Sequence, residues 1–156
     1  MARSVRLSDD ECWAVLESAH TGILTSLRRD GSPVSLPVWF VALHRRVYVA
    51  GPAPTRKFSR IRRDPRVGFL VESGTSWAEL VGVHFNGRAR PVAPGELLDE
   101  VTTALDGEYT AFRTAREDMP DATRSRYETA TTTIEIVPEG RILSWDNSRV
   151  FEEDAP

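Results

Sequence analysis

One stretch of the chain decides the fold: residues 21–72, which read TGILTSLRRDGSPVSLPVWFVALHRRVYVAGPAPTRKFSRIRRDPRVGFLVE. Apolar side chains recur at every second position from Val34 to Phe40, which is the period of a strand with two different faces. The Asp30-Gly31 pair before them supplies the positive φ angles of a tight hairpin turn. The stretch predicts a short helix at 55–63 and strands at 22–28, 32–41, 47–50 and 66–72.

The N-terminal flank predicts a helix. Ser8 and Glu11 form a capping box, and the apolar stripe that follows contains Cys12. We interpret Cys12 as a small buried hydrophobe and not as a nucleophile, because no histidine partner is recognisable near it. A single cysteine allows neither an internal disulfide nor a thiolate metal cage, so the expected compartment is the cytoplasm.

The C-terminal half is expected to complete the sheet. A bent strand is predicted at 77–92, with Gly82 and Gly87 as bulge or corner positions. The next helix begins at 94–96 and is expected to break at Gly107. The two final strands are predicted at 131–137 and 141–145, joined by a turn at 138–140.

Composition limits the classes of function. A chain of 156 residues fits one domain, and its net charge of −3 argues against general nucleic-acid binding. No apolar stretch approaches the roughly 18 residues that cross a bilayer, and the N-terminus lacks the apolar core of a signal peptide. His20, His44 and His84 are scattered without metal-ligand spacing, so no metal site is expected.

The basic segment after the third strand is the first candidate site. Thr55, Arg56 and Lys57 offer a hydroxyl donor, a planar guanidinium fork and a point charge, which together suit a phosphate group. A helix that starts here adds free backbone amides. The alternative is a solvated basic face, because Arg62 and Arg63 follow closely.

An ordered series of segments resembles one known family. The segments are GILTSLRRDGSPVSLPVWF (22–40), VYVAG (47–51), TRKFSRIRRDPRVGFLVE (55–72), HFNGRARPV (84–92) and IEIVPEGRILSWDNSRV (134–150). The series resembles the pyridoxamine 5'-phosphate oxidase-like flavin/deazaflavin oxidoreductases. The resemblance implies a mainly β fold with peripheral helices, the six-stranded split β-barrel known as the FMN-binding split barrel. We expect this single domain over residues 1–150 and an acidic tail at 151–156.

The resemblance also assigns roles to residues. Its basic TRK segment matches the one that holds the cofactor phosphate. The strand through Pro37, Val38 and Trp39 resembles the one along which the isoalloxazine ring lies; without the resemblance, Trp39 is a core residue. Family sites form between two subunits, which implies a homodimer. Trp145 either contributes to the partner's cofactor site or is buried in its own subunit.

The function implied is an oxidoreductase that transfers hydride to a small conjugated substrate, with no catalytic residue assigned. The deazaflavin F420 is the favoured cofactor and FMN the alternative, because the WF, RRDPRV and SWD segments look most like the deazaflavin-linked branch. F420 carries a long anionic tail, and Arg60 lies one turn after Arg56 and can line its exit. A non-catalytic protein that sequesters a flavin, haem or tetrapyrrole is the alternative, and pyridoxamine 5'-phosphate oxidation a weaker one.

Overall fold

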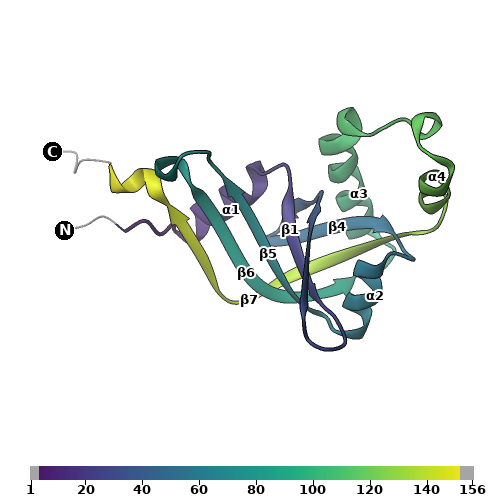
Figure 1. The fold of residues 1–156 in the computed structure, drawn as a ribbon, viewed down its shortest axis with the longest axis horizontal. Helices are drawn as coiled ribbons and strands as arrows, with labels where there is room; N and C mark the ends of the chain where they lie inside the picture. Colours follow the sequence, from purple (N-terminus) through teal and green to yellow (C-terminus); the bar gives the residue numbers. More distant parts are fainter. Residues whose placement is uncertain (1–3, 152–156) are drawn as a thin grey trace.

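An antiparallel sheet of seven strands organises the fold in the computed structural model, which describes residues 4–151 (Figure 1). The strand order is β2-β1-β5-β6-β7-β4-β3, and the sheet curls around an apolar core with helices on its outside. The prediction of a mainly β fold with peripheral helices is confirmed. The strands are β1 (Gly22–Leu27), β2 (Pro33–Val38), β3 (Val41–Leu43), β4 (Arg46–Pro52), β5 (Arg66–Ser73), β6 (Val81–Pro91) and β7 (Thr131–Asp146).

The six-stranded barrel that the resemblance implies is corrected to a sheet of seven strands. The strand expected at 32–41 divides at Trp39 and Phe40 into β2 and β3. The amide of Phe40 donates to the Tyr109 hydroxyl, 3.0 Å away, and its carbonyl oxygen lies 2.6 Å from the same hydroxyl, so neither group joins a ladder. β2 and β3 therefore form opposite edges of the sheet although only two residues separate them. Three peptide steps span about 11 Å at most, so the two edges must curl toward each other.

The end of the chain also differs from the prediction. The strands expected at 131–137 and 141–145 form one long strand, β7, because residues 138 and 139 stay paired with β6 through the bend. The register of β6 shifts between His84 and Asn86, and not at either predicted glycine. Gly82 instead allows a close approach, since a Cβ there would lie 2.1 Å from the Trp145 ring.

Within residues 4–151, four α-helices and four short 3-10 turns surround the sheet. The capping box is confirmed, with Glu11 accepting from the Ser8 amide at 2.7 Å. The helix predicted at 55–63 is also confirmed. The helix expected to break at Gly107 continues two residues further, because Tyr109 is anchored to Phe40. The helices are α1 (Asp9–Ser18), α2 (Arg56–Arg63), α3 (Glu96–Tyr109) and α4 (Asp121–Tyr127), and the turns are η1 (Trp77–Glu79), η2 (Thr110–Phe112), η3 (Arg116–Asp118) and η4 (Asn147–Val150).

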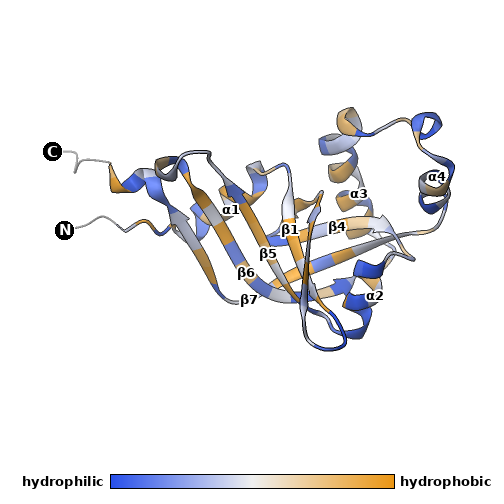
Figure 2. Cartoon of the chain, in the orientation of Figure 1, coloured by the Kyte–Doolittle hydropathy of each residue, from blue (hydrophilic) through white to orange (hydrophobic). Residues whose placement is uncertain are grey.

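Two apolar clusters hold these elements together. The larger fills the inside of the sheet and includes Cys12 of α1, which is 1% exposed as predicted. The smaller joins α3 to the outer face of β4 through Tyr48, Val101 and Leu105. In contrast to these apolar clusters, the surface of α2 is mostly hydrophilic (Figure 2). Across residues 4–151 no helix combines the length and hydropathy needed to cross a membrane. Apart from Phe151, the predicted acidic tail lies outside the described residues.

Candidate functional site

The candidate site is a cleft of about 1080 Å³ between the sheet and the segment that follows α3. Residues 37–39, 50–52, 131 and 133 line the sheet side, and Lys57 of α2 joins them. The opposite wall comes from residues between 102 and 129. Below, this space is called the main cleft.

A stacked aromatic pair forms the part of the main cleft near the end of β2. The Trp39 and Tyr109 rings lie 4.7 Å apart between centroids, with an interplanar angle of 10°. Trp39 is 38% exposed, whereas Tyr109 is buried behind it. His20 packs edge-on against Phe112, another residue of the cleft lining, at 4.6 Å. The arrangement offers a flat apolar surface whose position is fixed from behind.

Lys57 supplies the charge of the main cleft. It is the only lysine of the chain, and within residues 4–151 it has no hydrogen-bond or ion-pair partner. Its ammonium lies 5.1 Å from the centroid of the Phe58 ring and faces Gly51, which has no side chain to fill the space. Burial lowers the pKa of Lys57. A half-buried cation without a counter-charge is a favourable position for an anionic ligand group.

The main cleft brings together half of the predicted cofactor-binding residues. Its lining contains Pro37, Val38, Trp39 and Lys57, but not Thr55, Arg56, Arg60 or Trp145. The cofactor-binding role stays a prediction for all eight.

The other four residues have different surroundings. Thr55 is the N-cap of α2, and its hydroxyl oxygen is buried without a hydrogen-bond partner in the described part of the chain. Arg56 is exposed on the first turn, while Arg60 donates to the Ser26 hydroxyl at 2.8 Å. Trp145 is partly buried in its own subunit, where its ring covers Gly82 near the end of β7.

The far wall of the main cleft is absent from the sequence prediction. Residues 108–129 are mostly polar, and their sequence predicts only short helices. Nothing in that pattern indicates that they form one wall of a site. Tyr109 and Phe112 are the available signal, because two aromatic residues in such a segment need a packing partner.

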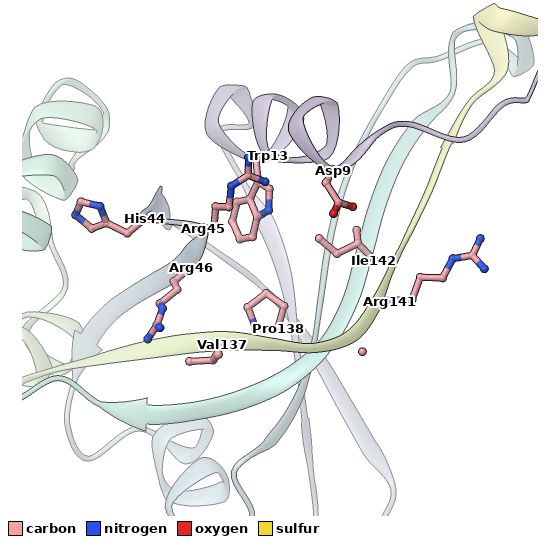
Figure 3. Close-up of a pocket in the computed structure, with 10 residues that line it drawn as sticks. Asp9, Trp13, His44, Arg45, Arg46, Val137, Pro138, Arg141 and Ile142 are labelled. Atoms are coloured by element: carbon pink, nitrogen blue, oxygen red, sulfur yellow. The ribbon is translucent and has the colours of Figure 1, made fainter.

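A smaller cavity of about 480 Å³ lies between α1, the β3–β4 turn and the bend of β7 (Figure 3). His44 and Arg141 point away from it in opposite directions. Its other cations are already paired, Arg45 with Asp10 and Arg46 with Glu135. It contains none of the predicted site residues, and residues 4–151 hold no cluster of potential metal ligands. The main cleft is therefore the better candidate.

Comparison with known proteins agrees with the fold. The model of the family described as pyridoxamine 5'-phosphate oxidase matches residues 8–140. The chain belongs to this family. The resemblance seen in the sequence is thereby confirmed at the level of the pyridoxamine 5'-phosphate oxidase-like proteins.

Solved structures of this fold bind more than one cofactor. A conserved hypothetical protein of Mycobacterium tuberculosis is 27% identical, with a TM-score of 0.79 over 100% of this chain and 96% of that one. A FAD-binding protein of Mesorhizobium loti is 20% identical, with a TM-score of 0.66 over 88% and 93%. HutZ, the haem storage protein of Vibrio cholerae, is 13% identical, with a TM-score of 0.68 over 92% of this chain and 96% of that one. Neighbours of the fold thus include both flavin-binding and haem-binding proteins.

Proposed function

We propose that this chain binds a flavin-type cofactor in the main cleft and acts as an oxidoreductase that transfers hydride to a small conjugated substrate. One observation carries the proposal: the exposed residues Pro37 and Trp39, at and just after the end of β2, line the same cleft as the chain's only lysine. This lysine is half-buried and unpaired within residues 4–151. A tricyclic ring with a phosphate on its side chain needs a flat surface and an anion site in one cavity. The family to which the chain belongs includes oxidoreductases.

The residues present fit such a cofactor. The volume of about 1080 Å³ is at the upper end of small-molecule sites. β2 is an edge strand, so one side of its backbone has no partner strand and is free to bond the polar edge of the ring. Lys57 would hold the phosphate. When bound, the ring itself supplies the hydride chemistry, and the protein's residues bind it, orient it and exclude water.

F420 is the cofactor we favour, with FMN as the alternative. The support is the resemblance of the WF, RRDPRV and SWD segments to the deazaflavin-linked branch, together with the arginines that follow Lys57. We further propose a homodimer in which the partner covers the open side of the cleft. The exposed side chains of Trp77 and Phe151, near the C-terminal end of β7, suit such an interface.

Titration of the purified protein with F420 and with FMN, followed by absorbance and fluorescence, tests the proposal. We expect saturable binding of at least one of them, and a loss of about tenfold or more in affinity for Lys57→Gln, because a charged hydrogen bond to phosphate disappears. Light scattering on the same sample checks the dimer. Failure of both cofactors to bind would overturn the proposal, as would equal affinities of the parent and Lys57→Gln.

The second candidate is a protein that sequesters haem. It is supported by the fold shared with HutZ and by His20, which packs against the Trp39 and Phe112 rings of the cleft. A haemin titration separates the two. A Soret shift that His20→Ala abolishes, without any flavin binding, would favour the sequestering function.

A further inference from the structure

We infer a second anion site where α2 meets the end of β1, built from the guanidinium groups of Arg28, Arg56, Arg60 and Arg63, for a small ligand with two or more adjacent phosphates or carboxylates. None of the four arginines lines the main cleft. The name "arginine site" is used for them below.

The arginine site is assembled by helical spacing and by the end of β1. Arg56, Arg60 and Arg63 are separated by four and three residues, so they share one face of α2. The side chains of this face reach the end of β1: Arg60 donates to the Ser26 hydroxyl at 2.8 Å, and Arg63 donates to the Leu27 carbonyl at 2.6 Å. Arg28 directly follows the end of β1, and its charge acts on Arg60, so the hairpin brings the fourth guanidinium near the other three.

These arginines lack the carboxylate partners that eight other arginines of the described residues have. Within residues 4–151 none of the four forms an ion pair. By contrast, ion pairs hold Arg45, Arg46, Arg66, Arg88, Arg90, Arg113, Arg124 and Arg149. The nearby carboxylates are engaged: Asp64 pairs with Arg66, and Asp30 accepts from Ser32.

If these arginines only formed a solvated basic face, Arg60 would be fully exposed to water, and it is not. It is partly buried, and its bonded partner is the neutral hydroxyl of Ser26, which is itself only 2% exposed. Burial lowers the pKa of Arg60, and the charges of Arg28, Arg56 and Arg63 lower it further. Like charges held together at a partly desolvated position are relieved by a bound anion.

The size and charge of the site define the ligand. Four guanidinium groups on one helical face and one hairpin can contact several oxygens of a short oligo-anion, and planar forks suit phosphate and carboxylate equally. The net charge of −3 for the whole chain disfavours a nucleic acid. The oligo-anion is either a free ligand or the anionic tail of a cofactor whose phosphate sits at Lys57, and the two sources share the same chemistry.

Calorimetric titration with inorganic tripolyphosphate, at low ionic strength and without cofactor, tests the arginine site. We expect binding by the parent, a loss of about tenfold or more in Arg60→Gln, and a clear loss in Arg28→Gln, an exposed variant that protects the test if Arg60→Gln folds poorly. Arg62→Gln is the matched control, because Arg62 lies on the same helix and its side chain is directed to the Ala53 carbonyl instead. It should change the affinity by less than about threefold.

Three results would overturn the inference: no binding by the parent, equal losses in Arg60→Gln and Arg62→Gln, or a loss in Lys57→Gln alone, which would place tripolyphosphate in the main cleft. A competition experiment then identifies the source. Tripolyphosphate that displaces F420 but not FMN indicates the cofactor tail, and displacement of neither indicates a free ligand. Because the first titration needs no cofactor, its failure leaves the proposed function untouched.

Discussion

The indole of Trp39 stacks on the ring of Tyr109 at 4.7 Å, and the Tyr109 hydroxyl bonds the backbone of the residue that follows Trp39. The same tyrosine therefore ends β2, anchors α3 and supports one wall of the main cleft. Its hydroxyl also lies 2.8 Å from the carbonyl oxygen of His20. A single side chain thus couples the closure of the sheet to the shape of the site.

Tyr109→Phe should lower the free energy of unfolding by about 1–3 kcal/mol, because the backbone groups of Phe40 lose their partner while the ring stack is kept. Urea denaturation measures the change. Tyr127→Phe is the control, since Tyr127 is 47% exposed, and its effect should stay within about 0.5 kcal/mol. Equal effects of the two variants would show that the buried hydroxyl contributes nothing special.

The affinity for the cofactor phosphate should depend on pH through Lys57. Burial lowers the pKa of this lysine, so its positive charge is lost at a lower pH than that of an ordinary lysine. Affinity should therefore fall as the pH rises through that lowered pKa, and Lys57→Gln should bind weakly at every pH. Titrations of the cofactor across the alkaline range give the profile. A parent profile as flat as that of the variant would contradict the assignment of Lys57 to the phosphate.

Local chemistry explains which parts of the fold were predictable. Asp30 accepts from Ser32 and Gly31 has a φ of +84°, so the hairpin follows from four consecutive residues. The turn at His44 and Arg45, between β3 and β4, has positive φ angles of 52° and 55° that are likewise set within the turn. The division of the strand at Phe40 was not predictable in this way, because its cause is a hydroxyl 69 residues away.

The residues of the candidate site also differ in whether local sequence or a distant contact determines their place. Lys57 and the strand through Pro37 belong to short segments that carry their own signals in the sequence. The far wall, with Phe112, becomes part of a site only when α3 packs against β4, which no local pattern specifies. The sequence predicts a bulge or corner at Gly82, because a glycine in a strand gives the same local signal whether it bends the chain or makes room for a ring.

Glu135 forms a buried charged network with three partners. It accepts from Arg46 at 2.9 Å, from the Tyr48 hydroxyl at 3.0 Å and from Arg90 at 2.5 Å. Burial favours the protonated carboxyl, but these hydrogen bonds outweigh it and lower the pKa of Glu135 below its ordinary value of 4.5. Burial, followed by the bond to Glu135, raises the pKa of Tyr48 to about 12, so Tyr48 remains a donor.

Glu135→Gln should lower the free energy of unfolding by about 1–3 kcal/mol at neutral pH, because the amide accepts fewer and weaker hydrogen bonds than the carboxylate. A lowered folded-state pKa contributes stability that is complete above the unfolded pKa and is lost as the pH falls through the folded one. The difference between parent and variant should therefore shrink below about pH 4.5. Urea denaturation at a series of pH values measures it, and a difference that is constant with pH would contradict the network.

Two glycine-to-alanine changes should act in opposite directions. A Cβ at Gly82 would lie 2.1 Å from the Trp145 ring, so Gly82→Ala must displace the indole or shift β6 against β7. We expect a loss of about 1–3 kcal/mol in the free energy of unfolding, with a changed tryptophan fluorescence. A Cβ at Gly107 meets nothing within 4 Å, and the residue lies inside α3, so Gly107→Ala should stabilise by about 0.5–1 kcal/mol. Thermal and urea denaturation of both variants check the pair. If Gly82→Ala is as stable as the parent and its fluorescence is unchanged, the Trp145 ring does not lie on Gly82. The indole would then not be partly buried in its own subunit, and its edge would instead be free to face the partner.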